Sequence, residues 1–286
     1  MAIEIAPQGV LAASRLSSDD SLVYAFQALP PGAIVPGVNE RNLRSYGPVT
    51  DAIRSTLDKV CSESCAVTIV IPDVTTRVFL LDFDFLPEMT VDAVAIIRFR
   101  LRKLVPFNVE SAKISYQSLP SQAERCRVLA AVIPEFILAE YEEAVGAAGY
   151  LPGAVLPSGL AALGTIRSSE PVLSACLSEC SLTTAITHGN DILLYRAHEL
   201  SNDRALRLSD VRRDVAVAAA YFEDRVVTRP ECLRYSGTST ATEFAGSLAL
   251  PGLSVVDLAP RHADTTSIPL ESTSIAGVTG ALAGAR

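Results

Sequence analysis

Hydrophobic and polar residues alternate along the first part of the chain, which is the pattern of β-strands. Ile3 and Ile5, then Val10 and Ala12, lie on either side of the turn-forming stretch Pro7–Gly9 and predict a hairpin. Residues 22–29 predict a third strand. Residues 67–71 are nearly all apolar, so we expect a central strand of a sheet there, with another strand after the Pro-Asp turn that follows.

Helical periodicity begins after these strands. Pro48 suits a first helical turn, and Ile53, Leu57 and Val60 recur at helical spacing. A second helix is predicted from an N-cap at residue 90 to Pro106, which ends it. Its buried stripe is predicted at spacing i, i+3, i+7 and i+10, on Val94, Ile97, Leu101 and Leu104.

Residues 112–119 and 126–133 then predict paired strands, and residues 135–149 a helix that Gly149 ends. The second half repeats the opening pattern, with three strands over residues 171–200 and a helix over residues 209–226. Strands at 232–240 and 253–260 and a small-residue helix at 275–285 complete the chain. Because both halves begin with a three-strand meander, we interpret the chain as duplicated.

These elements predict an α/β protein of three units. They are a first lobe of residues 1–87, an inserted helix–strand–strand–helix subdomain of residues 88–150, and a second lobe of residues 151–286. Composition agrees with this fold class, because the chain has no Trp and its apolar residues are mostly those that fill sheets covered on both faces.

Charge and hydropathy exclude several classes of function. The 24 basic and 32 acidic residues give a net charge of −8, which disfavours nucleic-acid binding. No apolar run is long enough for a membrane span, and no signal peptide is apparent. The six cysteines form no dense disulfide framework, so we expect a cytoplasmic protein without direct membrane insertion.

Few residues have the spacing of catalytic or metal sites. The pairs Cys61/Cys65 and Cys176/Cys180 leave a four-cysteine zinc site open as an alternative, but we favour buried free thiols because structural zinc knuckles are usually tighter. The histidines lack paired spacing. No P-loop, Rossmann fingerprint or serine nucleophile elbow is present.

The helix before Pro106 is unusually basic for an acidic chain. It carries Arg98, Arg100, Arg102 and Lys103. Such charges are often only a solvated helix face. The alternative is a partner surface, since arginine and aromatic residues are common interface anchors and Phe107 follows directly.

Several stretches resemble the PilM family of type IV pilus assembly proteins, which are actin-like and related to FtsA. They are "ALPPGAIVPGVN", "VTDAIRSTLDKV", "VTIVIPD", "FRLRKLVPFNVESAKISYQSL", "VLAAVIPEFILAEYEEAVGAAGYLPGAV" and "SGLAAL", within residues 28–165. The resemblance implies an actin-like (ribonuclease H-like) fold of two lobes with an FtsA/PilM-type extra subdomain. It also implies a reduced second lobe, because only about ten residues stand where the family has a fourth subdomain.

The resemblance also implies partners. Family members bind the cytoplasmic tail of PilN, an inner-membrane protein, and link the platform to the motor machinery, which suggests the pilus motor ATPase as a further partner. We expect the tail to lie in a groove between the first lobe and the subdomain. One predicted wall is formed by residues 67–71 and 77–81, and the other by the helix that carries Arg98 and Arg102, together with Phe107. The partner-binding residues are predicted to be Arg77, Arg98, Arg102, Pro106 and Phe107.

The family's nucleotide site is altered here. Glu4 and Gly9 stand in the first phosphate hairpin, where Pro7 removes an amide donor and Leu11 replaces the family's Lys. Cys176 and Ser178 replace the Asp and Gly of the second hairpin, and Gly237 is followed by Thr instead of a second glycine. The set Glu4, Gly9, Ser178 and Gly237 is therefore a remnant of the site.

We accordingly interpret the chain as a non-catalytic adaptor of a type IV pilus or related secretion platform, peripheral to the inner membrane, without a cofactor. One alternative is an active actin-like ATPase or sugar-kinase relative, which would bind ATP and magnesium. The other is the cytoplasmic L component of a type II secretion system, which has the same fold but normally also carries a membrane span.

Overall fold

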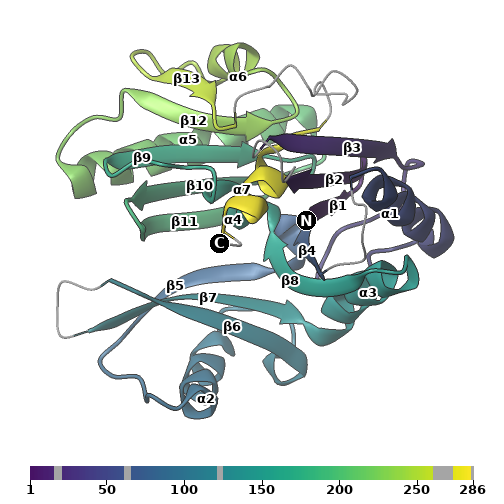
Figure 1. The fold of residues 1–286 in the computed structure, drawn as a ribbon. Helices are drawn as coiled ribbons and strands as arrows, with labels where there is room; N and C mark the ends of the chain where they lie inside the picture. Colours follow the sequence, from purple (N-terminus) through teal and green to yellow (C-terminus); the bar gives the residue numbers. More distant parts are fainter. Residues whose placement is uncertain (16–20, 61–65, 121–124, 260–272, 285–286) are drawn as a thin grey trace.

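A computed structural model of the chain describes residues 1–15, 21–60, 66–120, 125–259 and 273–284. It contains two five-stranded sheets and one three-stranded sheet (Figure 1). In each five-stranded sheet an antiparallel meander of three strands is extended by two parallel strands, in the orders β3-β2-β1-β4-β8 and β11-β10-β9-β12-β13. This shared order is the duplication that the sequence predicted.

The first sheet forms the lobe on the right of Figure 1. Its strands are β1 (Ala2–Ala6), β2 (Gly9–Arg15), β3 (Leu22–Ala28), β4 (Ala66–Ile71) and β8 (Leu151–Pro157). The helices α1 (Tyr46–Val60) and α3 (Glu135–Ala147) pack on one face, and α4 (Ser158–Leu163) and α7 (Ala276–Gly284) on the other. The predicted hairpin and the predicted central strand β4 are confirmed.

The second sheet forms the upper lobe. Its strands are β9 (Pro171–Leu177), β10 (Ser181–His188), β11 (Asp191–Glu199), β12 (Cys232–Gly237) and β13 (Ser254–Asp257). The helices α5 (Arg204–Val226) and α6 (Ala241–Leu248) bury their apolar residues against it. Only residues 200–203 connect β11 to α5, because α5 begins earlier than the predicted residue 209, at an N-cap that Asp203 provides.

The third sheet has the order β5-β7-β6 and forms the lower body in Figure 1. Its strands are β5 (Arg77–Phe83), β6 (Ala112–Leu119) and β7 (Cys126–Pro134), with the short 3₁₀ helix η2 (Val109–Ser111) before β6. Helix α2 (Thr90–Leu101) packs on one face of this sheet. The pairing of β6 with β7 that the sequence predicted is confirmed.

Some helix boundaries and one buried stripe differ from the prediction. Residue 89, not Thr90, is the N-cap of α2, and the helix ends at Leu101, well before Pro106. Its buried residues are Ala93, Ile97 and Leu101, whereas Leu104 is exposed because it lies past the helix end. The sequence pattern did not predict β8, α4 or α6, which are all short elements.

The predicted ranges 1–87, 88–150 and 151–286 stay a prediction about folding units. In the sheets, β5 lies before residue 88 but pairs with β7, and β8 lies after residue 150 but pairs with β4. Helix α7, from the far end of the chain, packs on β1 and β2. Among the described helices, none is long and apolar enough to cross a membrane.

Candidate functional site

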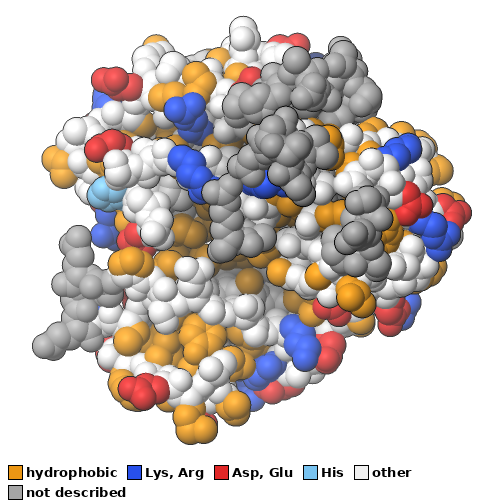
Figure 2. Space-filling view, in the orientation of Figure 1, with side chains coloured by type: hydrophobic (Ala, Val, Ile, Leu, Met, Phe, Trp, Pro, Cys, Tyr) orange, Lys and Arg blue, Asp and Glu red, His pale blue; other side chains and the backbone are white. Residues whose placement is uncertain are grey.

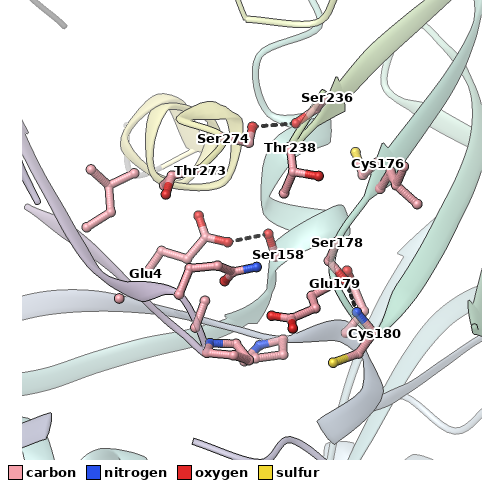
Figure 3. A pocket seen from close by; sticks show the side chains of 18 of the residues that line it. Glu4, Ser158, Cys176, Ser178, Glu179, Cys180, Ser236, Thr238, Thr273 and Ser274 are labelled. Carbon is pink, nitrogen blue, oxygen red and sulfur yellow. Dashed lines mark hydrogen bonds between the residues drawn. The ribbon is translucent and has the colours of Figure 1, made fainter. Parts of the chain in front are cut away.

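The two lobes meet at a cleft lined by the β1–β2 turn, the 3₁₀ helix η1 (Asp73–Thr75), the β9–β10 turn and the end of β12 (Figure 3). Its cavity has a volume of about 70 Å³. Small-molecule pockets usually measure roughly 300–1,000 Å³. With the lobes in this arrangement, the cavity is therefore smaller than a usual small-molecule pocket.

Glu4 projects from β1 into this cleft. Ser158 Oγ donates a 2.6 Å hydrogen bond to Glu4 Oε1, while Oε2 is buried without a partner among the described residues. A Cβ atom at residue 277 would lie 2.7 Å from Oε2, so glycine at this position lets α7 approach the carboxyl group without displacing it. Burial raises the pKa of Glu4 to about 7, and the nearby Asp73 carboxylate adds to the increase.

Asp73 is a second buried carboxylate, and it joins the two lobes. The Gly159 amide donates to both of its oxygens at 3.0 and 3.1 Å, and the Tyr195 hydroxyl of β11 donates to Oδ1 at 3.1 Å. Burial raises the pKa of Asp73 to about 6, although these hydrogen bonds oppose the increase. Asp73 and its partners were not among the site residues that the sequence predicted; the available signal was an acidic residue two positions after the predicted central strand.

The β9–β10 turn already uses its polar backbone atoms. Ser178 Oγ accepts hydrogen bonds from the amides of Cys180, at 3.2 Å, and Ser181, at 3.0 Å. The Arg207 guanidinium donates to the carbonyl oxygens of Ser178, at 2.7 Å, and Glu179. A phosphate in the cleft would have to compete with Ser178 Oγ for these amides. Their hydrogen bonds therefore stabilise the turn itself.

The glycines of the predicted remnant site have structural reasons to be glycine. A Cβ atom at Gly9 would lie 2.5 Å from the carbonyl oxygen of Gln27. A Cβ atom at Gly237 would lie 2.9 Å from the carbonyl oxygen of Leu177 and would collide with the Tyr235 hydroxyl. Glu4, Gly9 and Ser178 line one cavity, while Gly237 lines a smaller hollow beside it. The sequence had grouped residues that the fold brings close together.

The cleft lining is acidic. It includes Glu4, Asp73 and Glu179, and none of its described residues is Lys or Arg. Phosphate sites depend on cationic side chains and free amides. Chemically, this cleft can hold protons on two buried carboxyl groups, but it offers no positive charge to a triphosphate.

The cysteines and histidines show no metal geometry in the described part of the chain. Cys176 is a free thiol in the cleft, and burial raises its pKa. His198 Nδ1 contacts Asp214 instead of another histidine or a cysteine. Cys61, Cys65 and His262 lie outside the described residues.

The arginines predicted to bind a partner already bind this chain. Arg77 donates to the carbonyl oxygen of Val74 at 2.9 Å. Arg98 donates to the carbonyl oxygens of Val109 and, at 3.2 Å, Ala112.

Arg102 forms an exposed ion pair with Glu110, with Nη2 and Oε1 2.5 Å apart. Pro106 is exposed, whereas Phe107 is partly buried against the apolar core between α2 and its sheet. Of the five predicted residues, Arg102 and Pro106 are thus the most accessible.

One predicted wall of the partner groove is not accessible. Val67, Ile69, Val70 and Ile71 of β4 are at most 1% exposed, because β4 lies between β1 and β8 in the middle of its sheet. Helix α2 also lies on the far side of the three-stranded sheet from the first lobe (Figure 1). The prediction that residues 67–71 line a groove with α2 is therefore wrong.

The three-stranded sheet has a second face, on the side opposite α2, and its strand β5 contacts β11 of the second lobe. Strand alternation places Ser115 and Gln117 of β6 opposite the α2 side, next to Ala131 and Leu129 of β7. Ile133 lies on this same face of β7 and packs in the apolar core of the first lobe. We call this surface the inner face. Val78 and Leu80 of β5 complete it, and they are half-buried.

No family model matches the sequence, and no curated protein matches it. Solved structures do resemble the chain. A "PilM-PilN type IV pilus biogenesis complex" has a TM-score of 0.71 and 17% identity over 99% of this chain and 98% of that chain. The cytoplasmic domain of EpsL, an inner membrane component of the Vibrio cholerae type II secretion system, has a TM-score of 0.54 and 11% identity over 98% of this chain and 93% of that chain.

A Bacteroides thetaiotaomicron protein with an actin-like ATPase fold and unknown function has a TM-score of 0.51 and 11% identity, over 94% of both chains. At these identities the likeness shows the fold. The fold is actin-like, as the sequence predicted, and it is shared with a protein of the PilM–PilN complex.

Burial of Glu4 generates a prediction about pH. Because its pKa is raised from 4.5 to about 7, the folded protein keeps a proton that the unfolded chain loses. This contribution to stability is complete below pH 4.5 and is lost as pH rises through 7. We expect Glu4→Gln to raise the free energy of unfolding by about 1–3 kcal/mol at pH 8 and to change it little at pH 4.5, measured by urea denaturation. The exposed Glu179→Gln is the control, and a Glu4→Gln variant less stable at pH 8 than the unmodified protein would contradict the prediction.

The contacts of Arg98 and Arg102 generate a second prediction. Arg98→Ala leaves two carbonyl groups without their charged donor, one of them on the buried Val109, and should lower the free energy of unfolding by about 1–3 kcal/mol. Arg102→Ala removes only an exposed ion pair and should cost less than about 1 kcal/mol. Equal losses in thermal or urea denaturation would show that Arg98 is not structural.

Proposed function

We propose that this chain is a non-catalytic, PilM-type adaptor in the cytoplasm. In this role it binds the cytoplasmic tail of a PilN-like protein and so joins the inner-membrane platform of a type IV pilus. The observation that carries the proposal is the likeness to the PilM–PilN complex over nearly the whole of both chains. The stretches that resemble the PilM family support it independently of that likeness.

The chemistry of the cleft supports the non-catalytic part of the proposal. Phosphoryl transfer needs positive charge, carboxylates available to a magnesium ion and free backbone amides at the phosphates. In this cleft Asp73 is engaged by the Gly159 amide and Tyr195, and the β9–β10 turn bonds to itself. Pro7 also lacks an amide hydrogen. An active ATPase is therefore the less favoured reading.

A second candidate is the L component of a type II secretion system. The likeness to the cytoplasmic domain of EpsL favours it, since that domain also covers nearly all of this chain. Both candidates belong to inner-membrane assembly platforms. We favour the pilus adaptor because the similarity to the PilM–PilN complex is the greater of the two.

We propose the inner face as the site of the tail. Val78, Leu80 and Ala131 supply a half-buried apolar strip, and Ser115 and Gln117 supply an exposed polar rim along the edge strand β6. An extended peptide suits such a surface, because its backbone can pair with a free strand edge while alternate side chains pack on the apolar strip.

The cleft chemistry predicts that ATP will not stabilise the protein. A ligand at about 100 times its dissociation constant adds about 2.7 kcal/mol to the free energy of unfolding, which moves a melting curve clearly. We expect no shift in melting temperature with millimolar magnesium ATP, with AMP as the matched control. A shift with ATP that AMP does not produce would overturn the non-catalytic assignment.

The inner face predicts the effect of three matched substitutions on tail binding. Ser115→Arg and Gln117→Arg place bulky charges on this face and should each weaken binding of a synthetic PilN tail peptide by at least about tenfold, measured by calorimetry. Ser118→Arg puts the same side chain on the opposite face of β6 and should change the affinity less than about twofold. If all three variants bind alike, the tail lies elsewhere; if the unmodified protein does not bind, the adaptor assignment fails.

A further inference from the structure

Two buried carboxyl groups, those of Glu4 and Asp73, lie where the two lobes meet. Glu4 belongs to β1 of the first lobe. Its Oε1 accepts the hydrogen bond from Ser158, and its Oε2 is shielded from solvent without a partner among the described residues. A buried carboxylate oxygen that accepts no hydrogen bond strongly disfavours the ionised form. The closed cleft therefore suits the neutral form of Glu4.

The groups around these carboxyls supply no positive charge in the described part of the cleft. The β9–β10 turn contributes Glu179 and Cys180, β9 contributes Cys176, and the lining groups of α4, β12 and the residues before α7 are hydroxyls. Arg207 does not line the cavity, because it lies behind the β9–β10 turn and donates to the carbonyl oxygens there. Figure 2 shows the Lys and Arg side chains of this side of the molecule on its outer surface.

Hydrogen bonds hold the lobes together around this cleft. The Tyr195 hydroxyl of β11 donates to Asp73 Oδ1 at 3.1 Å. The hydroxyl oxygens of Ser236, at the end of β12, and Ser274, just before α7, are 2.6 Å apart. Cys176 of the second lobe also packs against the apolar core of the first lobe. Separation of the lobes would break these bonds, uncover Cys176 and let water reach both carboxyl groups.

The same interface continues to the three-stranded sheet. The 3₁₀ helix η1, which carries Asp73, leads into β5. Arg77 Nη2, at the start of β5, lies 3.9 Å from Glu199 Oε2, at the end of β11. The position of β5 is therefore coupled to the arrangement of the two lobes.

Protons determine how favourable the closed arrangement is. Burial raises the pKa of Glu4 from 4.5 to about 7 and that of Asp73 from 3.8 to about 6. The closed form thus holds protons that a hydrated, open form loses. For Glu4, the contribution to closure is complete below pH 4.5 and is lost as pH rises through 7.

We propose that the carboxyl groups of Glu4 and Asp73 form a proton switch that opens and closes the cleft between the lobes. While they hold a proton, the lobes close over them and Tyr195 keeps its hydrogen bond to Asp73. When both are ionised, two negative charges face each other without a cation, so the lobes separate and water hydrates them. Each sheet keeps its own strand pairing during this step, which makes it a partial opening and not unfolding. The switch is independent of the tail site.

Alkylation of Cys176 by N-ethylmaleimide tests the switch in the full chain. Cys232 is the internal reference, because it is also a half-buried free thiol but does not line the cleft. Peptide mass spectrometry gives both rates in one sample, and their ratio removes the general effect of pH on thiols. With the pKa of Glu4 about 7 when closed and 4.5 in water, the opening constant rises about tenfold between pH 6 and pH 8. We expect the ratio to rise by at least about tenfold.

The direction of this change is specific to opening. Burial, and then the charges of Asp73 and Glu4, raise the pKa of Cys176. Ionisation of the two carboxyl groups in a closed cleft would therefore slow the alkylation of this thiol, since the thiolate is the reactive form. A faster reaction at pH 8 relative to Cys232 requires that the cleft opens.

Two pairs of variants identify the groups responsible. Glu4→Gln should reduce the rise between pH 6 and pH 8 to about twofold, the part that Asp73 contributes, while the exposed Glu179→Gln should keep the full rise. Tyr195→Phe removes a bond between the lobes and should increase the ratio at pH 6 by about fivefold. Tyr221→Phe is its control, because the Tyr221 hydroxyl contacts Leu193 within the second lobe and should leave the ratio unchanged.

A ratio that stays within about twofold between pH 6 and pH 8 in the unmodified protein would overturn the proposal. So would a rise in Glu4→Gln equal to that of the unmodified protein, because Glu4 would then not control the opening. An unchanged ratio in Tyr195→Phe at pH 6 would also contradict it, since Cys176 would be reached without separation of the lobes. Circular dichroism at both pH values checks that each variant is folded.

Discussion

The buried carboxylate of Asp73 is the contact on which the arrangement of the two lobes depends. It follows Pro72, after the interior strand β4 of the first sheet, and accepts hydrogen bonds from the Gly159 amide and from the Tyr195 hydroxyl of the second lobe. A buried carboxylate without partners would be strongly unfavourable, so these donors must stay in place. The small cavity beside it and the raised pKa values of Asp73 and Glu4 both follow from this closed arrangement.

The end of the chain closes the same cleft from the other side. Helix α7 lies over β1 and β2 and packs tightly against α4, where glycine at residues 164 and 280 leaves room for the backbones to meet. Tyr24 of β3 also bonds to Thr279 of α7 at 3.0 Å. Residues of β1, β2 and α7 thus share one apolar core, so α7 packs as part of the first lobe.

The two sides of the three-stranded sheet differ. Helix α2 covers one side with Ala93, Ile97 and Leu101. The opposite side, the inner face, is an apolar strip with Ser115 and Gln117 along the edge strand β6, which suits the extended peptide that we propose as its ligand.

The sequence by itself determined most of the elements and the fold class. Period-two and helical patterns identified the meanders and most helices, and Pro7, Leu11 and Cys176 led us to expect an altered nucleotide site. Only the tertiary structure decided what the polar residues do. Asp73 meets Tyr195 across 122 positions of sequence, and Arg98 bonds to its own subdomain instead of a partner. Local patterns show which residues of an element are apolar, but a hydrogen bond between distant residues, and which apolar face of a helix is buried, depend on how the elements pack.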